Sequence, residues 1–116
     1  MSSKTFIWVK TQFHGVHCYP EAPSEVDYLR SVHRHLFKVK ATVQVHHDDR
    51  EVEFHMMQNF IDSLYTEKNL DVNRKSCEML AKELLDTLIS KYGNKRDYRV
   101  EVSEDGECGA FIELLN

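Results

Sequence analysis

The sequence predicts an α+β fold with the element order β-β-α-α-β-β, in which an antiparallel four-stranded sheet carries two helices on one face. Three patterns in the chain of 116 residues support this class. The first 47 residues favour strands, residues 54–92 place apolar side chains at helical spacing, and the residues from 98 onward form two β-rich runs around an Asp-Gly pair. A chain of this length has room for one compact domain, so residues 1–116 are predicted to form a single domain.

Two long strands are predicted in the first part of the chain. Thr5–Tyr19 is rich in β-branched and aromatic residues, and the Pro-Glu-Ala-Pro run after it ends the strand. An irregular connection over 24–32 follows, with a short helical turn at 26–29. His33–His47 alternates almost strictly between one set of apolar residues and histidines and another of polar residues. This alternation predicts a strand with one buried face.

Two amphipathic helices are predicted between residues 54 and 92. The first, of about three turns, is indicated by apolar residues at helical spacing, which are Phe54, Met57, Phe60, Ile61 and Leu64. Ser76 suits the N-cap of the second helix, Glu78 complements the helix dipole in its first turn, and Gly93 ends it. The apolar stripe of this helix comprises Leu80, Ala81, Leu84, Leu85, Leu88, Ile89 and Tyr92.

The last two strands, Tyr98–Glu104 and Gly109–Leu114, are joined through Asp105-Gly106, a dipeptide that favours a hairpin turn. Glu104 continues the apolar alternation, so it lies on the buried face and its carboxylate needs a partner. An amidine-like pair of NH groups on a ligand, such as the edge of a pterin or guanine ring, is one partner. A salt bridge to Arg96 or Arg99, or a strand end that emerges into water, is the alternative.

Composition argues against several partners. Fifteen basic and nineteen acidic residues give a net charge of −4, and the basic residues are scattered, which argues against nucleic acid. No apolar run approaches the roughly 18 residues of a membrane helix, and the first residues lack the layout of a signal peptide, so a cytoplasmic protein is expected. The three cysteines show no CxxC spacing and cannot all pair, which favours a reducing compartment.

Histidines are concentrated near the start of the chain, where six of the seven lie in the first 47 residues. His33 and His35 are two apart on a strand, so both rings project from the same face. His17 is the best candidate for a third ligand if no bulge intervenes at Gly15, whereas His14 lies on the other face. Three histidines with one open position are typical of a catalytic zinc site, although strand histidines also bond backbone groups at a core edge.

Five sequence landmarks occur in an order that resembles the tunnelling-fold (T-fold) superfamily. They are Phe13–His17, the His-x-His-x-Phe run His33–Phe37, Val52–Phe54, Lys75–Glu78 and the Val-x-Val-x-Glu run Val100–Glu104. Within the superfamily the chain is most similar to the 6-pyruvoyl-tetrahydropterin synthase and 6-carboxytetrahydropterin synthase family. The resemblance implies that His17, His33 and His35 are zinc ligands. It also implies that Glu104 holds a pterin ring in a pocket that Glu78 helps to line, and that sheets close into a barrel in a homo-oligomer, a trimer or hexamer.

The proton-transfer residues of that family are not matched. The family's catalytic cysteine corresponds to Leu29. Its Asp-His pair corresponds to the segment 69–73, which has Asp71 but carries a valine where the histidine belongs. Some relatives use a nearby acid, for which Glu25 and Asp27 are candidates, and His55 with Asp71 is a further one. Cys18 and Cys77 are unconvincing substitutes.

Three functions therefore stay open. The first is a zinc-dependent lyase that acts on a pterin resembling dihydroneopterin triphosphate, with altered acid-base residues. The second is a T-fold protein that binds a pterin, purine or nucleotide-like ligand without turnover. The third is an interaction module whose zinc only stabilises the fold, which requires a fourth protein ligand, with His14 the nearby histidine.

Overall fold

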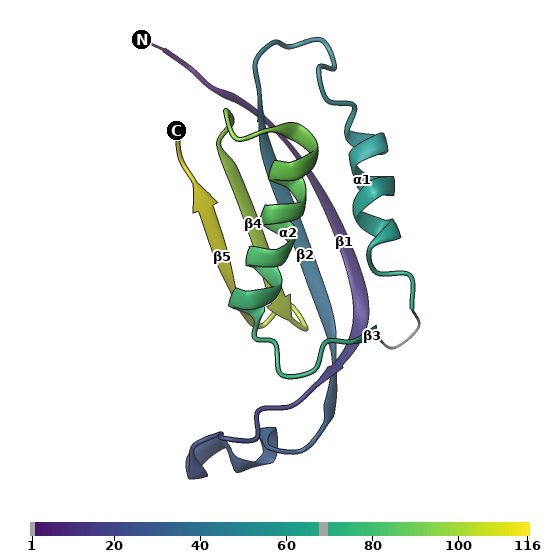
Figure 1. Cartoon of the computed structure of the whole chain (residues 1–116), viewed down its shortest axis with the longest axis vertical. Helices are drawn as coiled ribbons and strands as arrows, with labels where there is room; N and C mark the ends of the chain where they lie inside the picture. Colours follow the sequence, from purple (N-terminus) through teal and green to yellow (C-terminus); the bar gives the residue numbers. More distant parts are fainter. Residues whose placement is uncertain (1, 68–69) are drawn as a thin grey trace.

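The computed structural model describes residues 2–67 and 70–116, and Figure 1 shows the arrangement of its helices and strands. In chain order they are β1 (Thr5–His17), the 3-10 helix η1 (Ser24–Leu29), β2 (His33–Val45), α1 (Phe54–Ser63), β3 (Leu70–Asp71), α2 (Cys77–Tyr92), β4 (Tyr98–Glu104) and β5 (Cys108–Leu114). The strands form one sheet in the order β3-β1-β2-β4-β5, and α1 and α2 cover the same face of it. The predicted α+β class is therefore confirmed.

The sheet has five strands, and the prediction of four antiparallel ones is wrong, because the two-residue β3 pairs parallel with β1. Asp71 pairs with Val16, and the amide of Val72 donates to the Val16 carbonyl at 3.0 Å. Backbone groups and the burial of one side chain, Val72, hold this short bridge, so no alternation in the sequence marks it. Asn69, the first residue of the segment compared with the Asp-His pair, lies outside the described residues.

The ladder between β1 and β2 positions the histidines. It runs without interruption along both strands and ends at the pair His17–His33. No bulge occurs at Gly15. The Phe37 ring packs so close to the backbone there that a Cβ atom would lie 2.8 Å from it, so only glycine fits at this position. Both strands stop two residues before their predicted ends, since the next amide in each donates outside the sheet. The two donations are Cys18 N to Asn73 O at 3.0 Å and His46 N to Glu51 Oε1 at 2.6 Å.

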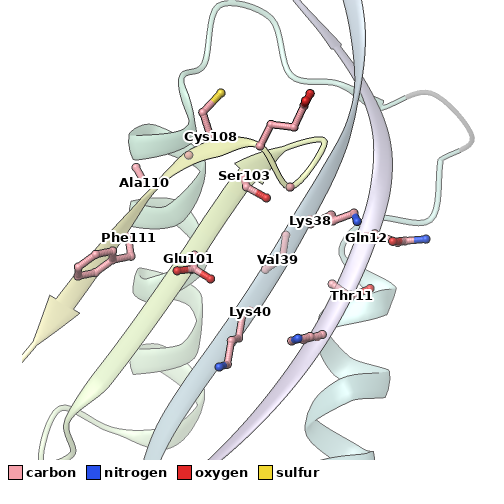
Figure 2. A pocket seen from close by; sticks show the side chains of 14 residues that line it. Thr11, Gln12, Lys38, Val39, Lys40, Glu101, Ser103, Cys108, Ala110 and Phe111 are labelled. Atoms are coloured by element: carbon pink, nitrogen blue, oxygen red, sulfur yellow. The ribbon is translucent and has the colours of Figure 1, made fainter.

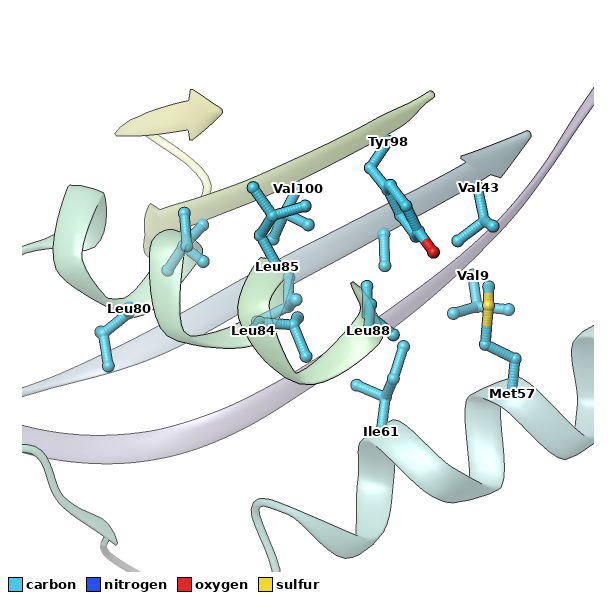
Figure 3. Packing of buried hydrophobic residues seen from close by; sticks show 14 of the residues in the cluster. Val9, Val43, Met57, Ile61, Leu80, Leu84, Leu85, Leu88, Tyr98 and Val100 are labelled. Carbon is cyan, nitrogen blue, oxygen red and sulfur yellow. The ribbon is translucent and has the colours of Figure 1, made fainter. Parts of the chain in front are cut away.

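The hydrophobic core lies between the sheet and the two helices, as Figure 3 shows. α2 contributes leucines from its predicted stripe, which are Leu80, Leu84, Leu85 and Leu88. α1 contributes Met57 and Ile61, whose side chains have no exposed surface. Every second residue of β2 from Phe37 to Val45 is buried, and His35 and His33 precede them on the same face. The histidines therefore form the polar end of an apolar face.

The opposite face of the sheet is hollowed by a cleft of about 620 Å³, whose lining Figure 2 shows. Exposed aromatic rings on this face are covered by cations: the Lys40 ammonium lies 4.9 Å from the centroid of the Trp8 ring, and the Arg99 guanidinium lies 3.8 Å from that of Phe111. Among the described residues, no helix has the length and apolar character needed to cross a membrane.

Candidate metal centre and adjoining cleft

Three histidines meet at one end of the inner face of the sheet. The register pairs His17 with His33, and His35 lies two residues further along β2 on the same face. The ring centroids are 4.5 to 5.2 Å apart, and one nitrogen of each ring lies within 4.8 Å of the other two. The three histidines can therefore hold one metal ion.

The Nδ1 atom of each ring is within hydrogen-bond distance of an oxygen that can only accept. The three contacts are His17 to the Lys75 carbonyl at 3.0 Å, His33 to the Ser31 carbonyl at 2.9 Å and His35 to the Asp105 carboxylate at 2.8 Å. Because carbonyl and carboxylate oxygens have no proton to give, Nδ1 must carry the hydrogen in all three rings. In the neutral imidazole, each Nε2 then presents a lone pair.

The Nε2 atoms are buried and have no hydrogen-bond partner among the described residues, in all three histidines alike. A buried polar atom without a partner is costly, and three at one place call for a common explanation. A metal ion accepts all three lone pairs at once, and Nδ1 hydrogen bonds of this kind orient metal-binding imidazoles in proteins. The donor set, three imidazole nitrogens, is one that zinc takes in catalytic sites.

Asp105 orients His35, a role that sequence reasoning missed. Its Oδ2 accepts from His35 Nδ1, its Oδ1 accepts from the Leu36 amide at 3.0 Å, and its own amide donates to the Leu36 carbonyl at 2.7 Å. The Leu36 amide and then the His35 ring lower the pKa of Asp105, so the carboxylate is ionised at neutral pH. Sequence reasoning placed Asp105 in a hairpin turn. Its proximity to His35 could be found only from the β2–β4 register, which pairs Phe37 with Glu104.

Exchange of Asp105 for asparagine is expected to weaken zinc binding by about tenfold. Removing a group that hydrogen-bonds a metal ligand usually weakens metal binding by about 10- to 100-fold, and asparagine keeps part of the contact. Asparagine tolerates the positive φ of this position (59°) and keeps the side-chain shape, so the loss of charge is isolated. Competition against a chromophoric chelator measures the affinity. Asp86→Asn, on the exposed face of α2, is the control, and equal affinities in both variants would contradict the role given to Asp105.

Glu104 lies against the same nitrogens. Its Oε2 is 3.1 Å from Nε2 of His17 and 3.7 Å from Nε2 of His35. The alternative partners considered for this carboxylate, two arginines, are engaged elsewhere: Arg96 contacts Glu51 at 3.0 Å, and Arg99 contacts Glu113 at 3.4 Å and Glu101 at 3.8 Å. Glu104 is therefore part of the histidine cluster rather than of a surface ion pair.

A cleft of about 570 Å³ adjoins the cluster, and its lining includes His17, His33 and Glu104. This volume lies in the range of small-molecule sites, about 300 to 1,000 Å³. The first turn of α2 forms one wall, where the Ser76 hydroxyl caps the helix by accepting from the Met79 amide at 3.1 Å. The structure places Glu78, expected to line the ligand pocket, on this wall.

All three cysteines line this cleft, a convergence that their spacing in the sequence does not reveal. Burial, with a smaller contribution from the charge of Glu104, raises the pKa of the Cys77 thiol to about 12, so this thiol stays protonated at neutral pH. Cys108 is exposed and pairs with Glu104 across the β4–β5 hairpin. Sequence reasoning counted this cysteine but did not weigh it as a substitute for the family's catalytic one. Leu29 also lines the cleft, where the resemblance suggests a cysteine.

The acids suggested for proton transfer are not among the residues that line the cleft. Glu25 and Asp27 are exposed on η1, and the Glu25 carboxylate accepts from the Ser24 hydroxyl at 3.0 Å. Asp71 is exposed on β3, where its carboxylate accepts from the Asn73 amide at 2.8 Å.

Two further histidines are remote from the cluster. His55 is exposed in the first turn of α1, which begins at the end of the sheet opposite the cluster (Figure 1). His14 is exposed on β1 and points to the other face of the sheet, as expected, so it does not supply a fourth ligand.

The chain has the fold of the 6-pyruvoyl tetrahydropterin synthases, as alignment with solved structures of these enzymes shows. The enzyme from Plasmodium vivax aligns over 97% of this chain and 98% of that chain, with a TM-score of 0.69 and 10% sequence identity. The Plasmodium falciparum enzyme aligns over the same shares, with a TM-score of 0.69 and 13% identity. A P. vivax variant with a glutamate replaced by alanine, described as a catalytic residue mutant, aligns equally well, with a TM-score of 0.69 and 10% identity over 97% and 98% of the two chains. No protein-family model and no curated protein matches the sequence.

Proposed function

We propose that this chain is a zinc-dependent protein of the 6-pyruvoyl- or 6-carboxytetrahydropterin synthase type, acting as a lyase on a pterin that resembles dihydroneopterin triphosphate. The observation that carries the proposal is the group of three unpartnered Nε2 atoms beside a carboxylate and a cleft of about 570 Å³. The fold shared with the two Plasmodium enzymes supports the choice of substrate class.

In this proposal, the inner face of β1 and β2 supplies the metal ligands His17, His33 and His35. A bound zinc ion supplies a Lewis acid that polarises oxygen atoms of the substrate side chain. Glu104 holds the pterin ring by accepting two hydrogen bonds from its amidine-like NH pair. Glu78 lines the same pocket from the start of α2.

Proton transfer is assigned to an acid of η1. The P. vivax variants replace a glutamate described as a catalytic residue, so a carboxylate serves in that enzyme. Glu25 and Asp27 are the acids of η1 here, and Val26 between them has non-helical backbone angles (φ −130°, ψ 38°). A rearrangement of η1 about Val26 brings one carboxylate to the cleft, and Asp71 on β3 is kept as a further candidate.

A binding protein without turnover is the second candidate, and one observation favours it. Leu29 gives the cleft an apolar side chain where the resemblance suggests a cysteine, while Glu25 and Asp27 lie outside the lining. Such a protein needs only the metal and Glu104 to hold a pterin, purine or nucleotide-like ligand.

Incubation of the zinc-loaded protein with dihydroneopterin triphosphate separates these two functions. A lyase releases a new pterin chromophore with time, whereas a binder gives a calorimetric signal without product. Both signals are expected to disappear in Glu104→Ala. If neither turnover nor binding is found with the zinc-loaded wild type, the pterin proposal is wrong.

Leu29→Cys is expected to raise the rate of product release by about 100-fold, because a positioned acid or base contributes about 10² to 10⁴. The side chain already lines the cleft, so the new thiol reaches it without a change of backbone. Leu64→Cys, at the end of α1, is the matched control. Equal rates in the two cysteine variants would show that position 29 has no part in proton transfer.

Assembly of the sheets into a barrel is also proposed. β5 is an edge strand, so its free backbone groups can pair with a strand of another subunit. Trp8 and Phe111 are more than half exposed on the outer face and give that subunit an apolar surface to cover. Sedimentation equilibrium at micromolar concentration is expected to give three or six times the chain mass of 13.7 kDa. A monomer under these conditions contradicts a barrel assembly.

A further inference from the structure

Glu104 has a second relation to the metal site besides the ligand-holding role proposed above. Its Oε2 lies 3.1 Å and 3.7 Å from the Nε2 atoms of His17 and His35. Neither approach has hydrogen-bonding geometry, since both nitrogens remain without a partner among the described residues. The side chain is 25% exposed, so water does not fully screen the contact.

A carboxylate oxygen and an imidazole lone pair repel each other at this distance. The Nε2 atom of His33 is buried without a partner as well. A divalent cation attracts the three lone pairs and the carboxylate alike, so it accounts for their proximity.

The spacing fits a shared ion. Ligand atoms about 2.0–2.1 Å from a tetrahedral zinc ion are about 3.3 Å from one another, and the two Glu104 contacts lie on either side of this value. His14, the fourth histidine considered, is on the other face of the sheet. Among the described residues, the side chains whose ligand atoms all lie within 4.8 Å of one another are His17, His33 and His35, and no thiol of the cleft belongs to that group. The Glu104 carboxylate is outside the group but contacts two of its three members, His17 and His35.

We propose that Glu104 is the fourth protein ligand of the metal while the cleft is empty, and that a ligand with an amidine-like NH pair draws it off the metal. Two parallel hydrogen bonds need both carboxylate oxygens, and one of them faces the histidines in the empty cleft. Binding of the ring therefore opens a coordination position beside the ligand. This inference rests on the proposed metal site and pterin ligand.

The test uses the full chain loaded with Co²⁺, whose visible absorption reports coordination number and ligand type. Glu104→Gln keeps the side-chain shape, so folding is preserved, and Glu101→Gln on the same strand is the control. We expect Glu104→Gln to lower the intensity of the tetrahedral bands and to weaken Zn²⁺ binding by more than about tenfold. Glu101→Gln is expected to match the wild type in both measurements.

A second measurement needs no substitution. Addition of unsubstituted pterin, whose ring has the NH pair but no side-chain hydroxyl to bind the metal, is expected to change the visible bands of the wild-type Co²⁺ protein, whereas buffer alone leaves them unchanged. If Glu104→Gln binds metal like the wild type, with the same spectrum, the fourth-ligand inference fails and the three-histidine site stands. If pterin binds without a spectral change, the exchange at Glu104 is overturned. A wild type that binds neither Co²⁺ nor Zn²⁺ overturns this inference and the proposed zinc site together.

Discussion

Replacing His33 with alanine is expected to abolish zinc binding, so that elemental analysis finds about one ion per chain in the wild type and none in the variant. Three protein ligands are the usual minimum for a catalytic zinc ion, and the substitution removes one of the three Nε2 atoms. His33 is only half-buried and lies at the end of its strand, so the variant should keep its fold. Protein for this measurement is prepared without chelator.

His14→Ala is the matched control, because it removes an exposed histidine from the opposite face of the neighbouring strand. It should retain the zinc content of the wild type. Zinc bound equally by wild type and His33→Ala would place the ion elsewhere, and a zinc-free wild type would remove the basis of the proposed function.

The second large effect is expected for Phe37→Ala, which should lower the free energy of unfolding by about 3–5 kcal/mol. The Phe37 ring has no exposed surface and stacks on Phe13, with 5.2 Å between centroids. It also packs edge-on against His17 and His35, at 5.2 and 5.9 Å, so it supports the metal site as well as the core. Urea unfolding of the metal-free protein measures the stability, and chelator competition measures the metal affinity.

Tyr28→Ala is the control for this substitution, because the side chain is 69% exposed on η1. Its removal should change the stability by less than about 0.5 kcal/mol. A loss in Phe37→Ala no larger than that of the control would show that the inner face of β2 is not the centre of the core.

The fold was largely predictable because its elements carry strong local signals. Alternation along β2 identified the buried face that ends in the histidines, and Ser76 and Gly93 marked the ends of α2 as the structure has them. β3 was not predictable, because it is held by backbone bonds and one buried valine. A two-residue bridge is too short to produce a periodic pattern.

The site was predictable only in part. The positions of His17, His33 and His35 on one face follow from the two-residue period of a strand, provided that no bulge occurs at Gly15. The positions of Asp105 and Cys108 depend on which residues of β2, β4 and β5 pair, and the sequence pattern does not determine that register. The contact of Glu104 with the histidines depends on its side-chain conformation, for which a single sequence carries no signal.

The central claim, that the histidine cluster is a metal centre, is tested most directly by anomalous diffraction at the zinc edge. Crystals of the wild-type protein grown without chelator are expected to show a single anomalous peak among the Nε2 atoms of His17, His33 and His35, with Glu104 beside it. Crystals without such a peak, in which solvent or protein groups donate hydrogen bonds to the three Nε2 atoms, would contradict the claim.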